Sequence, residues 1–180
     1  LMGISLENVN LSHVELSNSD LRGTNLENAN LSGADLSNSD LRGTNLENAN
    51  LSGTDLSYVN FRGANLLGTN LENANLSGAD LSYADLSRTN LMGANLVNAN
   101  LFGVNFVDVD LRNANLSGVD LTHTSFRGTN LGSTNLSGAD LSYTDLSGSN
   151  LMNTNLGNAN LSGLNLLEFD LRSTNLSGAD

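Results

Sequence analysis

The sequence contains no cysteine, proline, tryptophan or lysine, and aromatic residues make up only 4% of it. The absence of cysteine excludes a disulfide framework and any thiolate-ligated metal site. The absence of lysine excludes the Walker A phosphate-binding motif. Because proline is absent too, no proline-rich linker divides the 180 residues, and we expect one domain over residues 1–180.

Positive charge is also scarce. Seven arginines stand against nineteen acidic residues, which gives a net charge of -12. Such a charge repels nucleic-acid phosphate and anionic membranes, so we expect neither as a direct partner. No apolar run approaches the ~20 residues that cross a bilayer, and no secretory signal pattern opens the chain. These features favour a soluble protein and, among compartments, the cytoplasm.

What the sequence does contain is a five-residue repeat. Every fifth residue from Leu1 to Leu176 is Leu or Phe, at thirty-six positions without an exception. The residue two positions earlier is Ala, Thr, Val or Ser, except at Ile4, Leu164 and Phe169. The residue directly before each Leu or Phe is Asn or Asp in thirty-three of the thirty-six pentads. The remaining two positions vary, so the unit is small, polar, large apolar, any, any.

A period of five fits neither a straight α-helix nor a continuous strand. On a helix the leucines would spiral around all sides, and on a strand successive leucines would point to opposite faces. A backbone that bends by about a quarter turn in each pentad keeps every Leu inside. Four pentads then form one coil of twenty residues, and residues 21–33 and 41–53 are identical, as such a period allows. Nine coils at ~4.8 Å spacing would form a rod about 43 Å long.

The motif, in forms such as ANLSG, ADLSY and TNLEN, resembles the pentapeptide-repeat family over all 180 residues. The resemblance implies an all-β fold, a right-handed quadrilateral β-helix solenoid. It also implies that the Leu or Phe and the small residue two positions before it point inward. Eleven of the inward small residues are threonines. These need backbone partners, because an unpaired buried hydroxyl costs about 1–3 kcal/mol.

The chain begins and ends in phase with the repeat, without a capping element. A solenoid end exposes core side chains and unpaired backbone groups that invite pairing with another edge. We therefore expect an uncapped segment of a longer chain, whose end coils are covered by flanking domains or by end-to-end self-association.

Residues that would carry chemistry are sparse. There is no HExxH motif and no dinucleotide fingerprint. His13 and His123 would lie on different faces and six coils apart, so they cannot share a metal ion. Ser125, His123 and Asp145 lie one coil apart at most, yet nothing in the pattern supplies a pocket or an oxyanion hole. We predict no catalytic residues, no cofactor and no metal site.

Assigning successive pentads to four faces separates the charges. The face that begins at Leu16 carries only acids, which we call the acidic column: Asp20, Asp40, Asp80, Asp120, Asp140 and Asp180. A regular row of carboxylates resembles the charge of a nucleic-acid backbone, and the family resemblance implies DNA gyrase as a target for such a mimic. The other interpretation is that Asp and Asn alternate freely here as turn-capping residues, with the charge serving solubility.

The face that begins at Leu1 differs from the other three. It carries an arginine ladder and, farther along, an aromatic strip of Tyr83, Phe102, His123 and Tyr143. Aromatic and Arg side chains are enriched in protein-binding hot spots. We predict a non-enzymatic scaffold that binds another protein, of unknown identity, through this Arg–aromatic face: Arg22, Arg42, Arg62, Tyr83, Phe102 and Tyr143. The alternative is a DNA-mimicking inhibitor or protector of a DNA-binding enzyme, acting through the acidic column.

Overall fold

The computed structural model describes residues 1–180, and it contains one tight turn in every pentad. In the pentad of Leu21, the backbone N–H of Thr24 donates to the Leu21 carbonyl at 3.1 Å, which closes the turn. Counted from the Leu or Phe as the first residue, the third residue of the pentad has a positive φ, between 56° and 81°, in every pentad except that of Glu168. This geometry fits a type II turn, in which the third residue must be left-handed. The predicted bend once per pentad is therefore confirmed.

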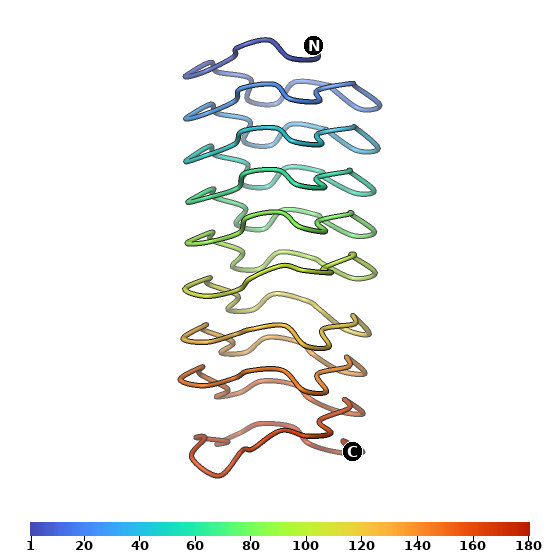
Figure 1. The fold of residues 1–180 in the computed structure, drawn as a ribbon, viewed down its shortest axis with the longest axis vertical. Helices are drawn as coiled ribbons and strands as arrows, with labels where there is room; N and C mark the ends of the chain where they lie inside the picture. Colours follow the sequence, from blue (N-terminus) through green and yellow to red (C-terminus); the bar gives the residue numbers. More distant parts are fainter.

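The straight segments between turns are too short to be strands. There are no helices and no extended strands, and each bridge is formed by the single Asn or Asp position of a pentad. Every bridge is parallel and joins residues twenty positions apart, as Asn25 does with Asn45. Two ladder bonds frame that bridge: Leu26 N–H donates to the Asn45 carbonyl at 2.7 Å, and Asn45 N–H donates to the Thr24 carbonyl at 3.0 Å. The chain therefore stacks as a solenoid, with its two termini at opposite ends of the rod (Figure 1).

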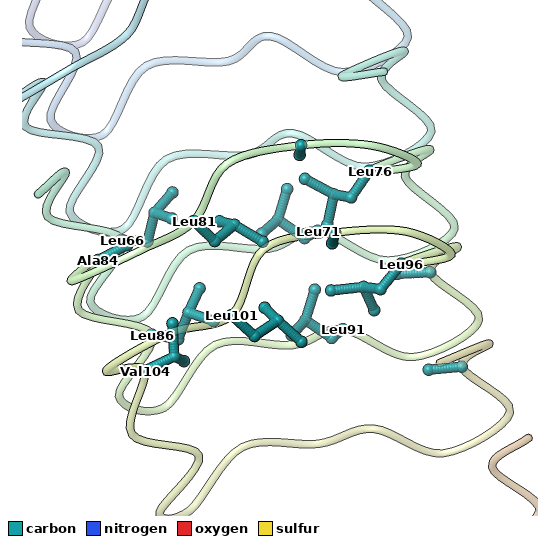
Figure 2. Close-up of a cluster of buried hydrophobic side chains, with 14 of the residues drawn as sticks. Leu66, Leu71, Leu76, Leu81, Ala84, Leu86, Leu91, Leu96, Leu101 and Val104 are labelled. Carbon is teal, nitrogen blue, oxygen red and sulfur yellow. The ribbon is translucent and has the colours of Figure 1, made fainter. Parts of the chain in front are cut away.

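The interior is filled by the Leu or Phe of each pentad and by the small residue two positions earlier. Forty-four buried hydrophobic residues form one continuous cluster along the rod. Figure 2 shows how Leu86, Leu91, Leu96 and Leu101 repeat, one layer below, the arrangement of the preceding coil. Each buried Leu contributes roughly 1.5–3 kcal/mol of hydrophobic stabilisation, so layering unites all coils into one core. The predicted inward positions are confirmed.

All eleven inward threonines have the backbone partners that the sequence predicts they need. Thr69, for example, is fully buried, and its hydroxyl donates to the Leu46 carbonyl of the preceding coil at 2.8 Å. Thr124 and Thr144 instead donate to the carbonyl three residues earlier in their own pentad. The hydrogen bond of the hydroxyl thus links two successive coils or lies within the turn of its own pentad.

The Asn and Asp positions cap the turns and also stack along the rod. The Oδ1 of Asn45 accepts the N–H of Glu47 at 3.2 Å, two residues ahead. The side-chain Nδ2 of Asn45 donates to Oδ1 of Asn25 in the preceding coil at 3.0 Å, and Asn65 repeats the contact on Asn45 at 2.9 Å. An Asp can cap a turn in the same way, but it lacks the amide donor. The turn-capping interpretation of this position is therefore confirmed.

Consecutive ladder bonds are missing in three stretches. Near the middle of the rod, three are missing between residues 84–88 and 105–107, and five between residues 98–104 and 117–125. Near the C-terminal end, five consecutive ladder bonds are missing between residues 144–151 and 165–170. There the last coil diverges from the one above it, as the red end of the ribbon shows (Figure 1). No helix of the structure is long and apolar enough to pass through a lipid bilayer.

Candidate functional site

The structure brings the aromatic strip together as two contacting groups on one face. Arg62 lies over the ring of Tyr83, with its guanidinium carbon 5.5 Å from the ring centroid. The Tyr83 ring meets Phe102 edge to face at 5.4 Å, and farther along His123 stacks on Tyr143 at 5.4 Å. Tyr83, Phe102 and Tyr143 remain 55%, 66% and 65% exposed, although each ring contacts a neighbour. The strip is thus an ordered aromatic surface that solvent still reaches.

The backbone fixes where these rings lie. Tyr83, His123 and Tyr143 all occupy the third position of their pentads, at φ values of 59°, 56° and 58°. From this position the side chain leans over the next coil, where Gly103 and Gly163 leave room for the rings of Tyr83 and Tyr143. A Cβ at Gly163 would lie 2.9 Å from a ring carbon of Tyr143, and one at Gly103 would lie 3.1 Å from Tyr83. Each tyrosine is therefore held flat above a glycine twenty residues later.

Arg22 and Arg42 do not stand free on the face, because each is paired with an acidic-column residue from the adjacent corner. Arg22 donates to both carboxylate oxygens of Asp20, at 2.9 and 2.7 Å, and Arg42 does the same with Asp40. The side-chain hydrogen bond from Arg22 lowers the pKa of Asp20 to about 2, and that from Arg42 lowers the pKa of Asp40. The acidic column and the Arg–aromatic face, which the sequence assigns to separate faces, are thus joined at this corner.

Arg62 differs from the other two because an asparagine precedes it. The residue two positions before Arg62 is Asn60, whose Oδ1 caps the turn by accepting the Arg62 N–H at 3.1 Å. Without a carboxylate at this position, the guanidinium lies over Tyr83 instead. A cation over an aromatic face gains roughly 0.5–1 kcal/mol at an exposed site and keeps its charge available to a partner. Arg62 is thus the arginine of this face that joins the aromatic strip.

The rest of the acidic column has no arginine partner, and its carboxylates cap turns. Oδ1 of Asp80 accepts from Ser82 N–H and from the Nδ2 of Asn100. Oδ1 of Asp140 accepts from Ser142 N–H and Asn160 Nδ2, and the bond from the Ser142 backbone is the largest cause of its lowered pKa. Asp120 caps Thr122, and Asp180 accepts no hydrogen bond from a side chain. Asparagines interrupt the column at positions 60, 100 and 160.

The residues considered for chemistry are not assembled into a site. The ring of His123 stacks on Tyr143, and no hydrogen bond joins its side chain to Ser125 or Asp145. His13 lies over Gly33 on another face. No group of three or more His, Asp or Glu side chains is arranged to hold a metal ion.

A cleft near the C-terminal end was not predicted from the sequence. We call it the inter-coil cleft; it has a volume of about 620 Å³ and separates two successive coils. The residues that line it are 147–152, 165 and 168–170. A neighbouring hollow of about 290 Å³ shares Ser147, Asn165 and Phe169 with it and extends to Tyr143 of the aromatic strip. The sequence signal was present, since Leu164 and Phe169 break the rule of a small inward residue.

The sequence matches one family along nearly its whole length. Residues 4–180 match the family described as pentapeptide repeats, in the overlapping segments 4–43, 29–68, 55–93, 69–108, 79–118, 114–151 and 149–180. The comparison with curated protein sequences found no match.

Solved structures with the same repeat resemble the chain. HetL, a pentapeptide repeat protein involved in heterocyst differentiation regulation in the cyanobacterium Nostoc sp. strain PCC 7120, is 31% identical, with a TM-score of 0.56 over 100% of this chain and 84% of HetL. Rfr23 from the cyanobacterium Cyanothece 51142 is 38% identical, with a TM-score of 0.56 over 62% of this chain and 87% of Rfr23.

A third similar structure is that of QnrB1, a plasmid-mediated fluoroquinolone resistance protein, in a trypsin-treated form. It is 21% identical, with a TM-score of 0.55 over 100% of this chain and 90% of QnrB1. At this identity the likeness concerns the fold alone. Together these structures place the chain among all-β solenoids built from five-residue repeats.

Proposed function

Because this chain belongs to the pentapeptide-repeat family, we propose that it is a non-enzymatic scaffold, a nine-coil quadrilateral β-helix that binds another protein through its Arg–aromatic face. The single observation that carries the proposal is the pair of exposed aromatic contacts, Arg62–Tyr83–Phe102 and His123–Tyr143. Rings held in place before binding lose little conformational entropy when a partner covers them. An aromatic surface of this kind suits a protein hot spot.

The contacts also indicate which residues of the Arg–aromatic face would contribute binding free energy. Arg22 and Arg42 are neutralised by Asp20 and Asp40, so they offer a partner no net charge. Binding free energy would then come from the aromatic strip and Arg62, while the paired arginines border it. Because burial of aromatic area is insensitive to salt, this interaction should persist at high ionic strength.

Phe102→Ser combined with Tyr143→Ser tests the proposal. We expect the double variant to lose the partner by at least about tenfold in apparent affinity, since each ring is a hot-spot residue type. The measurement is a crosslinked pull-down from a lysate of the source organism at low and high salt, with partners quantified by mass spectrometry. Tyr58→Ser is the matched control, because Tyr58 is 68% exposed but lies on a different face. A partner recovered equally with both variants contradicts the proposal.

The acidic column supports the second candidate, a DNA-mimicking inhibitor or protector of a DNA-binding enzyme. Asp80, Asp120, Asp140 and Asp180 have no arginine partner, and the fold resembles that of QnrB1. Such an interaction would weaken steeply with salt. A topoisomerase that is recovered only at low salt, and lost when Asp80, Asp120 and Asp140 are all changed to Asn, would favour this candidate over the first.

A further inference from the structure

We propose that the inter-coil cleft binds an extended, basic peptide segment of a partner protein, which enters it as an additional strand. The first observation is a complete interruption of the ladder. The N–H groups of Leu146, Gly148 and Leu151 have no hydrogen-bond acceptor, and the carbonyls of Thr144 and Ser149 have no donor. Gly148, Ser149 and Leu151 line the inter-coil cleft, and Thr144 and Leu146 line the neighbouring hollow.

The opposite side of the cleft carries the complementary unpaired groups. The N–H groups of Asn165 and Asp170 and the carbonyls of Asn165, Leu167 and Asp170 make no backbone hydrogen bond. The ladder is intact directly before and after the interruption, at Tyr143 with Ser162 (3.1 Å) and at Asn153 with Arg172 (3.2 Å). Two facing backbone edges are therefore held open while both ends of the opening remain attached. Unpaired edges of this kind are templates for pairing with another chain.

Two oversized inward residues lie in the coil that forms one side of the opening. Where other pentads place Ala, Thr, Val or Ser, this coil has Leu164 and Phe169, both partly buried against the core. Protein interiors are close-packed, so a corner that fits alanine cannot accept leucine or phenylalanine without moving the backbone. Glu168, which directly precedes Phe169 in the same pentad, is also the one third-position residue without a positive φ. The local turn geometry is altered together with the ladder.

The lining of the cleft indicates what it would accept. Met152 and Phe169 supply apolar surface, and Glu168 supplies a carboxylate that has no arginine partner. The volume of about 620 Å³ lies within the range of typical ligand sites. The net charge of -12 further favours a cationic occupant.

An extended peptide can form hydrogen bonds with the unpaired backbone N–H and C=O groups of the cleft. Its backbone can pair with one or both open edges, and its side chains alternate between the two faces of the strand. Apolar side chains at every second position would pack on Phe169 and Met152, and the basic side chains between them would face Glu168 and solvent. A sequence of alternating apolar and basic residues is thus the expected ligand class. This site is distinct from the Arg–aromatic face, although it begins beside Tyr143.

The test uses the full chain and a defined probe. The probe is an N-acetylated, C-amidated peptide of alternating valine and lysine, about eight residues long, the length of an ordinary strand. We expect it to bind in fluorescence polarisation and to slow amide hydrogen exchange at Leu146, Gly148 and Leu151. The same peptide with glutamate in place of lysine, and one with N-methylated alternate amides, should bind at least about tenfold more weakly. Equal binding of the three peptides, or protection elsewhere in the chain, overturns the proposal.

Two variants locate the site. Leu164→Ala combined with Phe169→Ala restores the small inward residues, so we expect the ladder to close and peptide binding to be lost. Ile4→Ala is the matched control, since Ile4 is the remaining oversized residue but lies at the other end of the rod. Glu168→Gln, which leaves the core unchanged, should weaken the lysine peptide by up to about fivefold. The proposal is contradicted if the cleft variants bind the lysine peptide as well as the original chain does. It is also contradicted if these amides exchange slowly without peptide because two copies of the chain associate.

Discussion

At the scale of single residues, the third position of the pentad decides which side chains can cover the surface. Its positive φ suits Gly and Asn, and for other L-residues it costs roughly 1–2 kcal/mol. All three tyrosines and both histidines of the chain nevertheless occupy it. Every tyrosine, and His13, lies above a glycine one coil later. The pairing of an aromatic residue with Gly twenty residues later is therefore a packing rule of this protein.

Gly78→Ala tests this rule. Gly78 has a φ of +69°, and an added Cβ would lie 2.6 Å from ring carbons of Tyr58. We expect a loss of about 1 kcal/mol for the left-handed backbone, with a further 0.5–1.5 kcal/mol, approximately, for displacing the ring from its rotamer. Urea denaturation measures the sum of these two losses in the free energy of unfolding.

Gly53→Ala is the control for the backbone term, because Gly53 has a similar φ of +63° and nothing within 4 Å of an added Cβ. The excess cost at Gly78 should disappear in a Tyr58→Ser background. Identical losses at the two glycines would show that the ring contributes nothing to the packing.

At the scale of the pentad, the inward position accepts a hydroxyl as readily as a methyl group. Thr69 is fully buried, and its hydroxyl reaches a carbonyl of the preceding coil. A backbone carbonyl that can accept a hydroxyl hydrogen bond recurs in each coil. Ala, Val and Thr can therefore all occupy the inward position. The sequence predicts that these threonines have backbone partners, but the choice between the previous coil and the same turn depends on how closely two coils approach.

Thr69→Val should destabilise the protein although it makes the core more apolar. The change conserves shape and removes the hydrogen bond to Leu46, so we expect a loss of about 0.5–1.5 kcal/mol in the free energy of unfolding. The reciprocal change Val59→Thr should be nearly neutral, because the Leu36 carbonyl lies in the equivalent position one coil earlier. Chemical denaturation of both variants checks the pair, and a gain in stability from Thr69→Val would contradict this role of the hydroxyl.

At the scale of the whole molecule, the nineteen acids repel one another, while many of the aspartates among them also cap turns. The pKa values of Asp20, Asp40 and Asp110 are lowered, first by the side-chain hydrogen bonds of Arg22, Arg42 and Arg112. Each such carboxylate stabilises the fold at a pH above its unfolded pKa, near 3.8, and this contribution is lost as pH falls through the folded value. Acid should therefore weaken the molecule although it relieves the repulsion.

We expect the thermal midpoint to be nearly constant from pH 7 to about pH 5 and to fall from about pH 4 towards pH 2, where Asp20 takes up its proton. Thermal unfolding followed by circular dichroism measures the profile. In Arg22→Gln, the part of the decline nearest pH 2, which comes from the protonation of Asp20, should disappear. A midpoint that rises between pH 4 and pH 2 would show that repulsion among the acids outweighs the paired carboxylates.

Much of the molecule could be predicted from the sequence because its decisive interactions are local and repeated. The five-residue period requires one bend per pentad, and the Leu and small positions must then face inward, whatever occupies the variable positions. Even the pairing of Arg22 with Asp20 has a local signal, since Asp precedes Arg by two positions there and Asn60 precedes Arg62. A sum of charges over each face does not reveal this pairing, because the two partners lie on neighbouring faces.

The tertiary structure alone decided which surfaces are ordered and where the ladder opens. The contact of Tyr83 with Phe102 depends on the direction of a left-handed side chain across two coils, which no spacing rule supplies. The inter-coil cleft depends on whether a misfit at Leu164 and Phe169 is absorbed by the side chains or by the backbone, and five ladder bonds give way together. The sequence by itself determined the repeat, the core and the outward positions, because each pentad meets the same requirement. Contacts between coils were decided only by the folded molecule, since they depend on the combined shape of residues twenty positions apart.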